Sequence, residues 1–140
     1  MPYEFFDHTG DIGVRLRGAS LDDLFEAGAE ALAETLADRS RIQPLVSDVV
    51  TLEAPDVDML LVDWLGELLY RFDVHGFLTA RATVAIRADV EHWLLSATIA
   101  GERLDPGRHQ IKVLLKAITH HALSVVRSEH GWEAKVVFDV

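Results

Sequence analysis

The sequence contains no cysteine, which excludes both a disulfide framework and a metal site built on thiolates. The first residues, Met-Pro-Tyr-Glu-Phe-Phe-Asp-His, lack the basic start and the apolar run of a secretory signal. The longest apolar region, residues 60–69, is interrupted by Asp63 and Glu67, so no membrane-spanning helix is expected. These absences predict a cytoplasmic protein with no membrane association.

Basic residues are also scarce, with 13 Lys and Arg against 23 Asp and Glu, and the formal net charge is −10. Direct, tight binding of RNA is therefore not expected, because neutralisation of phosphates by Lys and Arg supplies most of that affinity. An acidic protein can instead dock on a basic protein, and complementary charge then speeds the encounter. The composition favours a protein partner, with RNA reached only indirectly.

Motifs of common catalytic classes are missing as well. No Gly-x-Ser-x-Gly nucleophile motif occurs. Gly10 and Gly13 precede an expected strand rather than a helix, and no P-loop Lys-Ser/Thr follows them. The sequence therefore predicts neither a standard nucleophilic enzyme nor a nucleotide-binding loop. At 140 residues, with no repeat or linker, it predicts one domain over residues 1–140.

Two amphipathic helices are expected from the spacing of apolar residues. The first follows Ser20, which has the chemistry of a helix N-cap, and ends near Asp38. The second begins after Pro55-Asp56 and ends at His75-Gly76.

Strands are expected in most of the remaining chain. Alternating apolar residues indicate strands at 12–17 and 46–53 and a hairpin over 79–100 that turns near Asp89. Residues 111–126 fit a helix or a strand, and we favour a strand. In the last strand Ala134, Val136, Phe138 and Val140 are expected to face the core. The fold class expected is α+β: a two-layer sandwich with a mostly antiparallel mixed sheet and two helices packed on one of its faces.

The two ends of the chain carry the residues of a candidate cation site. Asp7, His8 and Asp11 lie near the start, and the sequence stops on Asp139 and the carboxylate of Val140. Carboxylates are hard oxygen ligands that Ca²⁺ or Mg²⁺ prefers. Asp, Thr and Gly are also ordinary turn residues, so the N-terminal group alone is equally explained by a turn. If the first and last strands are neighbours, the carboxylates repel one another unless a cation or proton lies between them.

Other polar residues carry weaker indications. The seven histidines show no zinc-binding spacing, and His120 and His121 would point to opposite faces of a strand. His8 could be a ligand, a general base or a structural histidine. Lys112 and Lys116 could contact a phosphate or carboxylate, or simply lie on a solvated face.

Five motifs in order resemble the archease family, whose members assist the RNA ligase that joins tRNA exons and other RNA ends. They are Asp-His-Thr-Gly-Asp-Ile-Gly at 7–13, Trp-Leu-x-Glu-Leu-Leu-Tyr at 64–70, Asp-Pro-x-x-His at 105–109, Lys-Ala-Ile-Thr at 116–119 with His121, and Gly131-Trp132 with the terminal Val-Phe-Asp-Val. The sequence departs from the family at Gly10, where Ala is usual, and at His120, where Tyr is usual.

The resemblance implies a compact α+β sandwich and a non-enzymatic role. It implies a divalent cation, calcium first with magnesium or manganese as alternatives, held by Asp11, Asp139 and Val140. It marks Asp7, His8 and Lys116 as residues linked to function with the partner. The partner implied is the RNA-splicing ligase, whose guanylylation and multiple turnover archease promotes, while the ligase itself uses GTP and manganese.

Two alternatives belong to other functional classes. One is a chaperone-like modulator of an RNA methyltransferase, which the family resemblance also allows. The other is a metal-dependent phosphate-ester hydrolase with His8 as its base, which predicts turnover without any partner.

Overall fold

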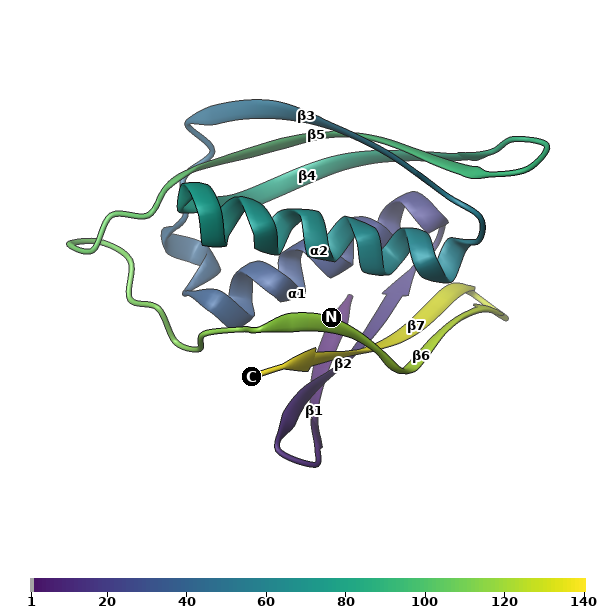
Figure 1. The fold of residues 1–140 in the computed structure, drawn as a ribbon, viewed down its shortest axis with the longest axis horizontal. Helices are drawn as coiled ribbons and strands as arrows, with labels where there is room; N and C mark the ends of the chain where they lie inside the picture. The colour runs from purple at the N-terminus through teal and green to yellow at the C-terminus, as the bar shows by residue number, and fades with distance from the viewer. Residues whose placement is uncertain (1) are drawn as a thin grey trace.

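The structure is a computed structural model, and it describes residues 2–140. Two helices lie between two antiparallel sheets, as the layers in Figure 1 show. One sheet has four strands in the order β1-β2-β7-β6, and the other has three in the order β3-β5-β4. The elements are β1 (Tyr3–His8), β2 (Asp11–Gly18), α1 (Leu21–Leu36), the short 3₁₀ helix η1 (Arg39–Arg41), β3 (Val46–Ala54), α2 (Val57–His75), β4 (Phe77–Ala88), β5 (Trp93–Arg103), β6 (Ala117–Ser128) and β7 (Gly131–Asp139).

The α+β class, the antiparallel pairing and the two helices are confirmed. The arrangement differs from the single sheet expected, because the strands divide into two sheets that cover the helices from both sides. The helices can fill this middle layer because both have apolar residues around much of their circumference. In α2 these include Trp64, whose indole N–H donates a hydrogen bond to the carbonyl of Phe25 in α1 at 2.9 Å.

Both helices begin where the sequence predicts. The hydroxyl of Ser20 accepts a hydrogen bond from the Asp23 N–H, and the carboxylate of Asp56 accepts one from the Met59 N–H. Each acceptor satisfies a backbone donor that the first turn of a helix leaves free. Gly76 ends α2 in the left-handed conformation, with φ of +65°. Within residues 2–140, neither helix combines the length and apolar composition that crossing a lipid bilayer demands.

The assignment of 111–126 to a strand is correct only for its second part. Strand β6 begins at Ala117, and residues 111–116 have no regular structure. In that segment the Lys112 N–H donates to the carbonyl of Leu36 at the end of α1, and the Lys112 ammonium binds Glu34 at 2.8 Å. These contacts with the end of a helix replace the pairing with a neighbouring strand. The stretch from 104 to 116 therefore crosses from one sheet to the other (Figure 1).

Strand β7 lies at the centre of the four-stranded sheet, between β2 and β6. Ala134, Val136 and Phe138 are buried on its inner face, as expected. Val137 faces outward in the alternation and is nevertheless only 1% exposed. It pairs with Gly13 of β2, and the ring of Phe6 lies across that glycine. Part of the outer face of the sheet is therefore covered by an aromatic side chain.

Candidate functional site

A tight hairpin holds the Asp-His-Thr-Gly-Asp motif. His8 ends β1 opposite Asp11, which begins β2, and only Thr9 and Gly10 connect them. Both connecting residues have positive φ, 41° and 86°, as the two central residues of a type I′ turn do. This turn matches the right-handed twist of the two strands, so it fixes Asp11 at the end of the hairpin.

The pairing of β2 with β7 brings the two ends of the sequence together. Ile12 lies opposite Phe138, and the same antiparallel register continued by one residue puts Asp11 beside Asp139. The Val140 N–H donates a hydrogen bond to Oδ1 of Asp11 at 3.4 Å. Asp11, Asp139 and Val140 are thus neighbours although Asp11 and Val140 are 129 positions apart.

The chemistry of this group fits a hard cation only in part. Asp11 and Asp139 are partly buried, and neither has an ion-pair partner among residues 2–140. Two adjacent carboxylates on neighbouring strands repel each other, so a cation between them would stabilise the pair. Nowhere in residues 2–140 do three or more His, Cys, Asp or Glu side chains form a group suited to a metal ion. The set therefore consists of two carboxylates and the main-chain oxygens of Val140.

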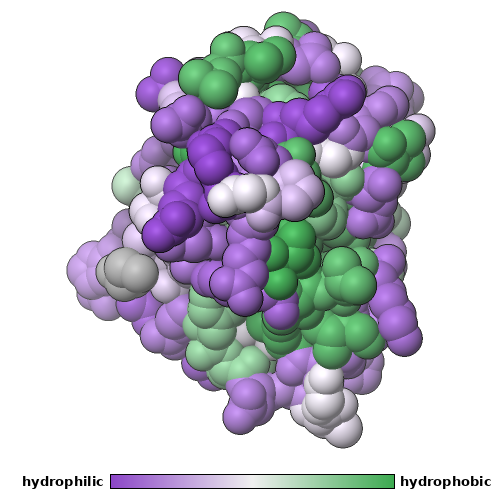
Figure 2. Space-filling view, turned by 90° about the vertical axis from the view of Figure 1, so that its left-hand side faces the viewer, coloured by the Kyte–Doolittle hydropathy of each residue, from purple (hydrophilic) through white to green (hydrophobic). Residues whose placement is uncertain are grey.

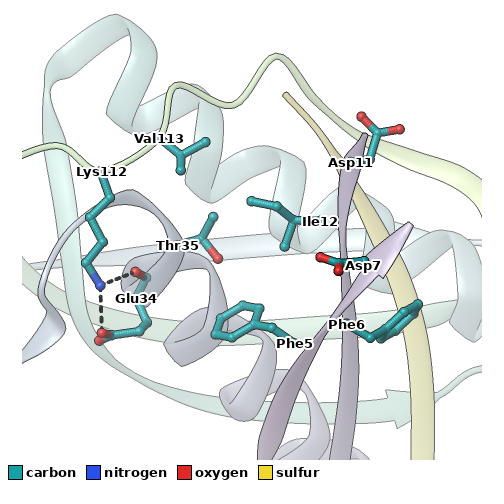
Figure 3. A pocket seen from close by; sticks show the side chains of 9 residues that line it. All are labelled: Phe5, Phe6, Asp7, Asp11, Ile12, Glu34, Thr35, Lys112 and Val113. Atoms are coloured by element: carbon teal, nitrogen blue, oxygen red, sulfur yellow. Dashed lines mark hydrogen bonds and ion pairs between the residues drawn. The ribbon is translucent and has the colours of Figure 1, made fainter. Parts of the chain in front are cut away.

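A groove of about 510 Å³ opens beside the hairpin. Its walls come from β1, β2, the end of α1 and the 111–116 segment; the lining residues are Phe5, Phe6, Asp7, Asp11, Ile12, Glu34, Thr35, Lys112 and Val113. Figure 3 shows the ring of Phe5 beside this space and the ring of Phe6 on the other side of the hairpin. The ammonium of Lys112 is bound to the side chain and the carbonyl of Glu34, at 2.8 and 3.0 Å. Two acidic residues of the wall, Asp7 and Asp11, have no cationic partner in the part of the chain from Pro2 onward that the structure describes.

Lys116 lines a different groove from the one beside the hairpin. Its N–H donates to the carbonyl of Asp139 at 2.8 Å. Its side chain lines a second groove between α2 and β6, together with Asp63 and Asp73 among others. Lys116 is therefore tied to the acidic group through the backbone, and it is not among the residues that line the groove beside the hairpin.

His8 has an unusual environment for a residue at a hairpin end. Its ring packs edge-on against that of His121, with the centroids 5.0 Å apart. Its Nδ1 is buried and has no hydrogen-bond partner among the described residues. His121 follows Thr119 in an irregular part of β6, where Ala122 has a φ of 56°. This bulge interrupts the regular pairing of β6 with β7, and the opposite orientation of His120 and His121 stays a prediction.

A buried polar network was missed from the sequence. Nε2 of His109 lies 3.1 Å from both Oε2 of Glu102 and the carbonyl of Arg41, while Nδ1 accepts a hydrogen bond from the Asp105 N–H at 2.9 Å. Since Nδ1 accepts, Nε2 carries the proton and donates it. Glu102 also accepts from the Gln43 N–H at 2.7 Å. The only trace of this network in the sequence is the motif Asp105-Pro-x-x-His109.

The charge of Glu102 is set by this network. Burial raises the pKa of its carboxyl, but the hydrogen bonds from Gln43, Arg108 and His109 outweigh burial, so the pKa lies below its ordinary value. The ionised carboxylate joins the end of β5 to the 104–116 segment. The network therefore anchors the chain that leads to Lys112 and Lys116.

The fold places the molecule among small α+β proteins in which two helices separate two antiparallel sheets. The sequence model of the Archease protein family matches residues 3–140, and the chain belongs to this family.

Relatives resemble the chain over nearly their whole length. The protein archease of Methanosarcina acetivorans is 34% identical over 139 residues, which cover 99% of this chain and 95% of the relative. The protein archease of Pyrococcus furiosus is also 34% identical over 139 residues, covering 99% and 98%.

Two solved structures have the same fold. The solution structure of protein 1598 of Methanobacterium thermoautotrophicum superposes with a TM-score of 0.83 at 29% identity and covers 99% of each chain. The crystal structure of an archease from Thermotoga maritima, named a possible chaperone, gives a TM-score of 0.59 at 20% identity, covering 96% of this chain and 94% of that one. The second likeness concerns the fold alone.

Proposed function

We propose that this chain is a non-enzymatic activator of a GTP-dependent RNA-splicing ligase, and that it acts through a divalent cation held by Asp11, Asp139 and Val140. Calcium is the expected ion, since all the ligands offered are oxygens. The observation that carries the proposal is the pairing of β2 with β7, because it brings the three residues together from opposite ends of the sequence. Membership of the archease family supports the choice of partner.

The incomplete set of ligands suits an activator better than a storage site. Calcium takes about six to eight oxygen ligands, and two carboxylates with the main-chain oxygens of Val140 supply fewer when each group binds through one oxygen. The remaining positions are open to water or to oxygen atoms of a partner. A cation bound in this way would supply positive charge to phosphate or carboxylate groups in the ligase. The role of Asp11 and Asp139 is to hold it at an exposed edge of the protein.

Neighbouring residues would hold the carboxylates of Asp11 and Asp139 in place. The hairpin turn fixes Asp11, and the Lys116 N–H fixes the carbonyl of Asp139. The Lys116 ammonium, which has no ion pair among residues 2–140, is available to an acidic group of the partner. His8 pairs with Asp11 across the hairpin. The contact of its ring with His121 connects the hairpin to β6.

A guanylylation assay tests the proposal. The transfer of guanylate from labelled GTP to the ligase is measured with the intact chain, with Asp11→Ala and with Asp139→Ala. We expect both variants to lose stimulation and to bind Ca²⁺ at least about tenfold more weakly by calorimetry, since one of few ligands is gone. Circular dichroism establishes that the variants are folded.

Asp89→Ala is the matched control, because Asp89 lies in the β4–β5 turn at the far end of the three-stranded sheet. It should stimulate like the intact chain. Full stimulation by both Asp11→Ala and Asp139→Ala would refute the proposal. Hydrolysis of generic phosphate esters by the chain alone, with Mg²⁺ or Mn²⁺, would instead favour the hydrolase alternative.

A further inference from the structure

An aromatic side chain on the inner face of the four-stranded sheet is left uncovered. Tyr3, Phe5 and Asp7 alternate along β1 on the side that faces the helices, and Tyr3 is 8% exposed. Phe5 is 44% exposed, although its register partner Val14 is fully buried. Strand β1 is an edge strand of its sheet, and Phe5 lines grooves there together with Glu34 at the end of α1.

Phe5 forms an apolar wall of the groove beside the hairpin, together with Ile12 and Val113. Val113 belongs to the irregular segment that crosses between the sheets. Figure 2 faces the side where this segment projects, and it shows hydrophobic side chains gathered in a hollow with hydrophilic ones around it. Apolar surface surrounded by polar residues is a common feature of protein interaction sites.

The charge of the groove is negative. Asp7 has no hydrogen bond or ion pair with a side chain among residues 2–140, and Asp11 accepts only the long bond from Val140. The one cation in the wall, Lys112, is neutralised by Glu34 (Figure 3). Because the proposed function assigns Asp11 to the divalent cation, Asp7 is the carboxylate that remains free for a ligand.

We propose that this groove binds a polypeptide segment of the partner in which an apolar side chain is followed by a lysine or arginine. The apolar side chain would lie against Phe5, Ile12 and Val113, and the cationic group would pair with Asp7. Charge complementarity decides against a second copy of this chain, since two copies with a net charge of −10 each would bring like-charged grooves together. Where the segment belongs to the ligase, the inference rests on the proposed function.

Titration of the ¹⁵N-labelled chain with a small peptide tests the groove without reference to the ligase. The probe is acetyl-Gly-Leu-Lys-Leu-Gly-amide, and the comparison peptide has Glu in place of Lys. We expect chemical-shift changes concentrated at residues 5–7, 11–12 and 112–113. The Lys peptide should bind about tenfold more tightly than the Glu peptide, since attraction to the carboxylate of Asp7 is exchanged for repulsion.

Two variants separate the apolar and the ionic contributions. Phe5→Ser should abolish the localised shifts, while the conservative Phe5→Leu should retain them. Asp7→Asn should remove the preference for the Lys peptide and keep the weak apolar contact. The controls are Val90→Ser and Glu91→Gln, an exposed apolar and an exposed acidic residue in the β4–β5 turn, and both should bind like the intact chain.

Shifts spread over the acidic surface, equal affinity for the two peptides, or equal loss in the control variants would overturn the inference. Concentration-dependent dimerisation through the groove, seen by sedimentation, would also overturn it. Failure of the peptide test with intact stimulation of the ligase contradicts the groove and leaves the proposed function standing. Localised peptide binding without any effect on the ligase contradicts the proposed function and leaves the groove standing.

Discussion

The ring of Phe6 lies flat against Gly13, so close that a β-carbon at position 13 would overlap the ring. The two residues are register partners in the β1–β2 hairpin, and Val137 pairs with Gly13 from the other side. The guanidinium of Arg15 stacks on the same ring, 4.6 Å from its centroid. A glycine in the interior of a strand, which usually weakens it, is here covered by an aromatic neighbour.

Substitution of Gly13 by alanine is expected to destabilise the protein by about 1–3 kcal/mol, the usual cost of an overpacked site. Urea unfolding measures the change. Phe6→Ala should lower the free energy of unfolding clearly less in the Gly13→Ala background than alone, because the alanine has already displaced the ring from its packing against residue 13. Additive costs in this double-mutant cycle would show that the two residues do not act as a unit.

Gly10→Ala should destabilise the hairpin although the side chain would enter open space. Nothing lies within 4 Å of the position of a β-carbon at Gly10, so only the backbone strain at a φ of +86° opposes the change. We expect a loss of about 1–2 kcal/mol. The control is Gly66→Ala in α2, which also has open space but helical geometry. It should stabilise the protein by about 0.5–1 kcal/mol, and two changes of the same sign would contradict the explanation.

Trp64→Phe should cost roughly 2 kcal/mol. It removes the hydrogen bond from the indole to the carbonyl of Phe25, worth about 1 kcal/mol, and leaves a void between the two helices. Thermal or urea unfolding measures the loss. Tyr70→Phe on the same helix, at an exposed position, should change the free energy of unfolding by less than about 0.5 kcal/mol.

The stability of the fold should depend on the ionisation of Glu102. Because the pKa of this carboxyl is lower in the folded protein than in the unfolded chain, its contribution is complete above the ordinary glutamate pKa of about 4.3. It is lost as the pH falls from there through the folded-state pKa. Glu102→Gln should therefore be less stable at neutral pH and show a flatter loss of stability in acid.

Glu129→Gln, in the exposed β6–β7 turn, is the control for this titration and should leave the acid profile unchanged. An identical acid profile for Glu102→Gln and the intact chain would show that the buried network does not titrate in this range. Denaturant unfolding at a series of pH values makes the comparison.

Local signals predicted most elements and several of their ends. Ser20 and Asp56 are N-caps whose chemistry is visible in the sequence, and Gly76 ends α2 as expected. The hairpin over 79–100 was also recognisable, because alternation over two runs separated by polar residues is a local property.

Features that depend on distant contacts could not be read in the same way. The division of the strands into two sheets depends on the 104–116 segment, whose path is set by contacts of Lys112 with the end of α1 and by the His109 network. The burial of Val137 on the outward face, opposite the Gly13 that the ring of Phe6 covers, is another feature of the assembled sheet. The candidate site required the first and last strands to be neighbours, a condition that the sequence left open and that the pairing of β2 with β7 meets. Whether a cation is bound there stays a prediction.

Strand β7 is inserted between β2 and β6, and this has a consequence for biosynthesis. The hairpin of β1 and β2 is synthesised before β7. The backbone N–H and C=O groups of β2 that pair with β7 therefore have no partner strand until residues 131–139 have left the ribosome. Pairing of strands so far apart in the sequence is slow. Until it occurs, the unpaired edge of β2 can pair with another chain. Asp11 can meet Val140 only after β7 has joined the sheet, so a molecule in which that strand is still unpaired cannot present the acidic group to a partner.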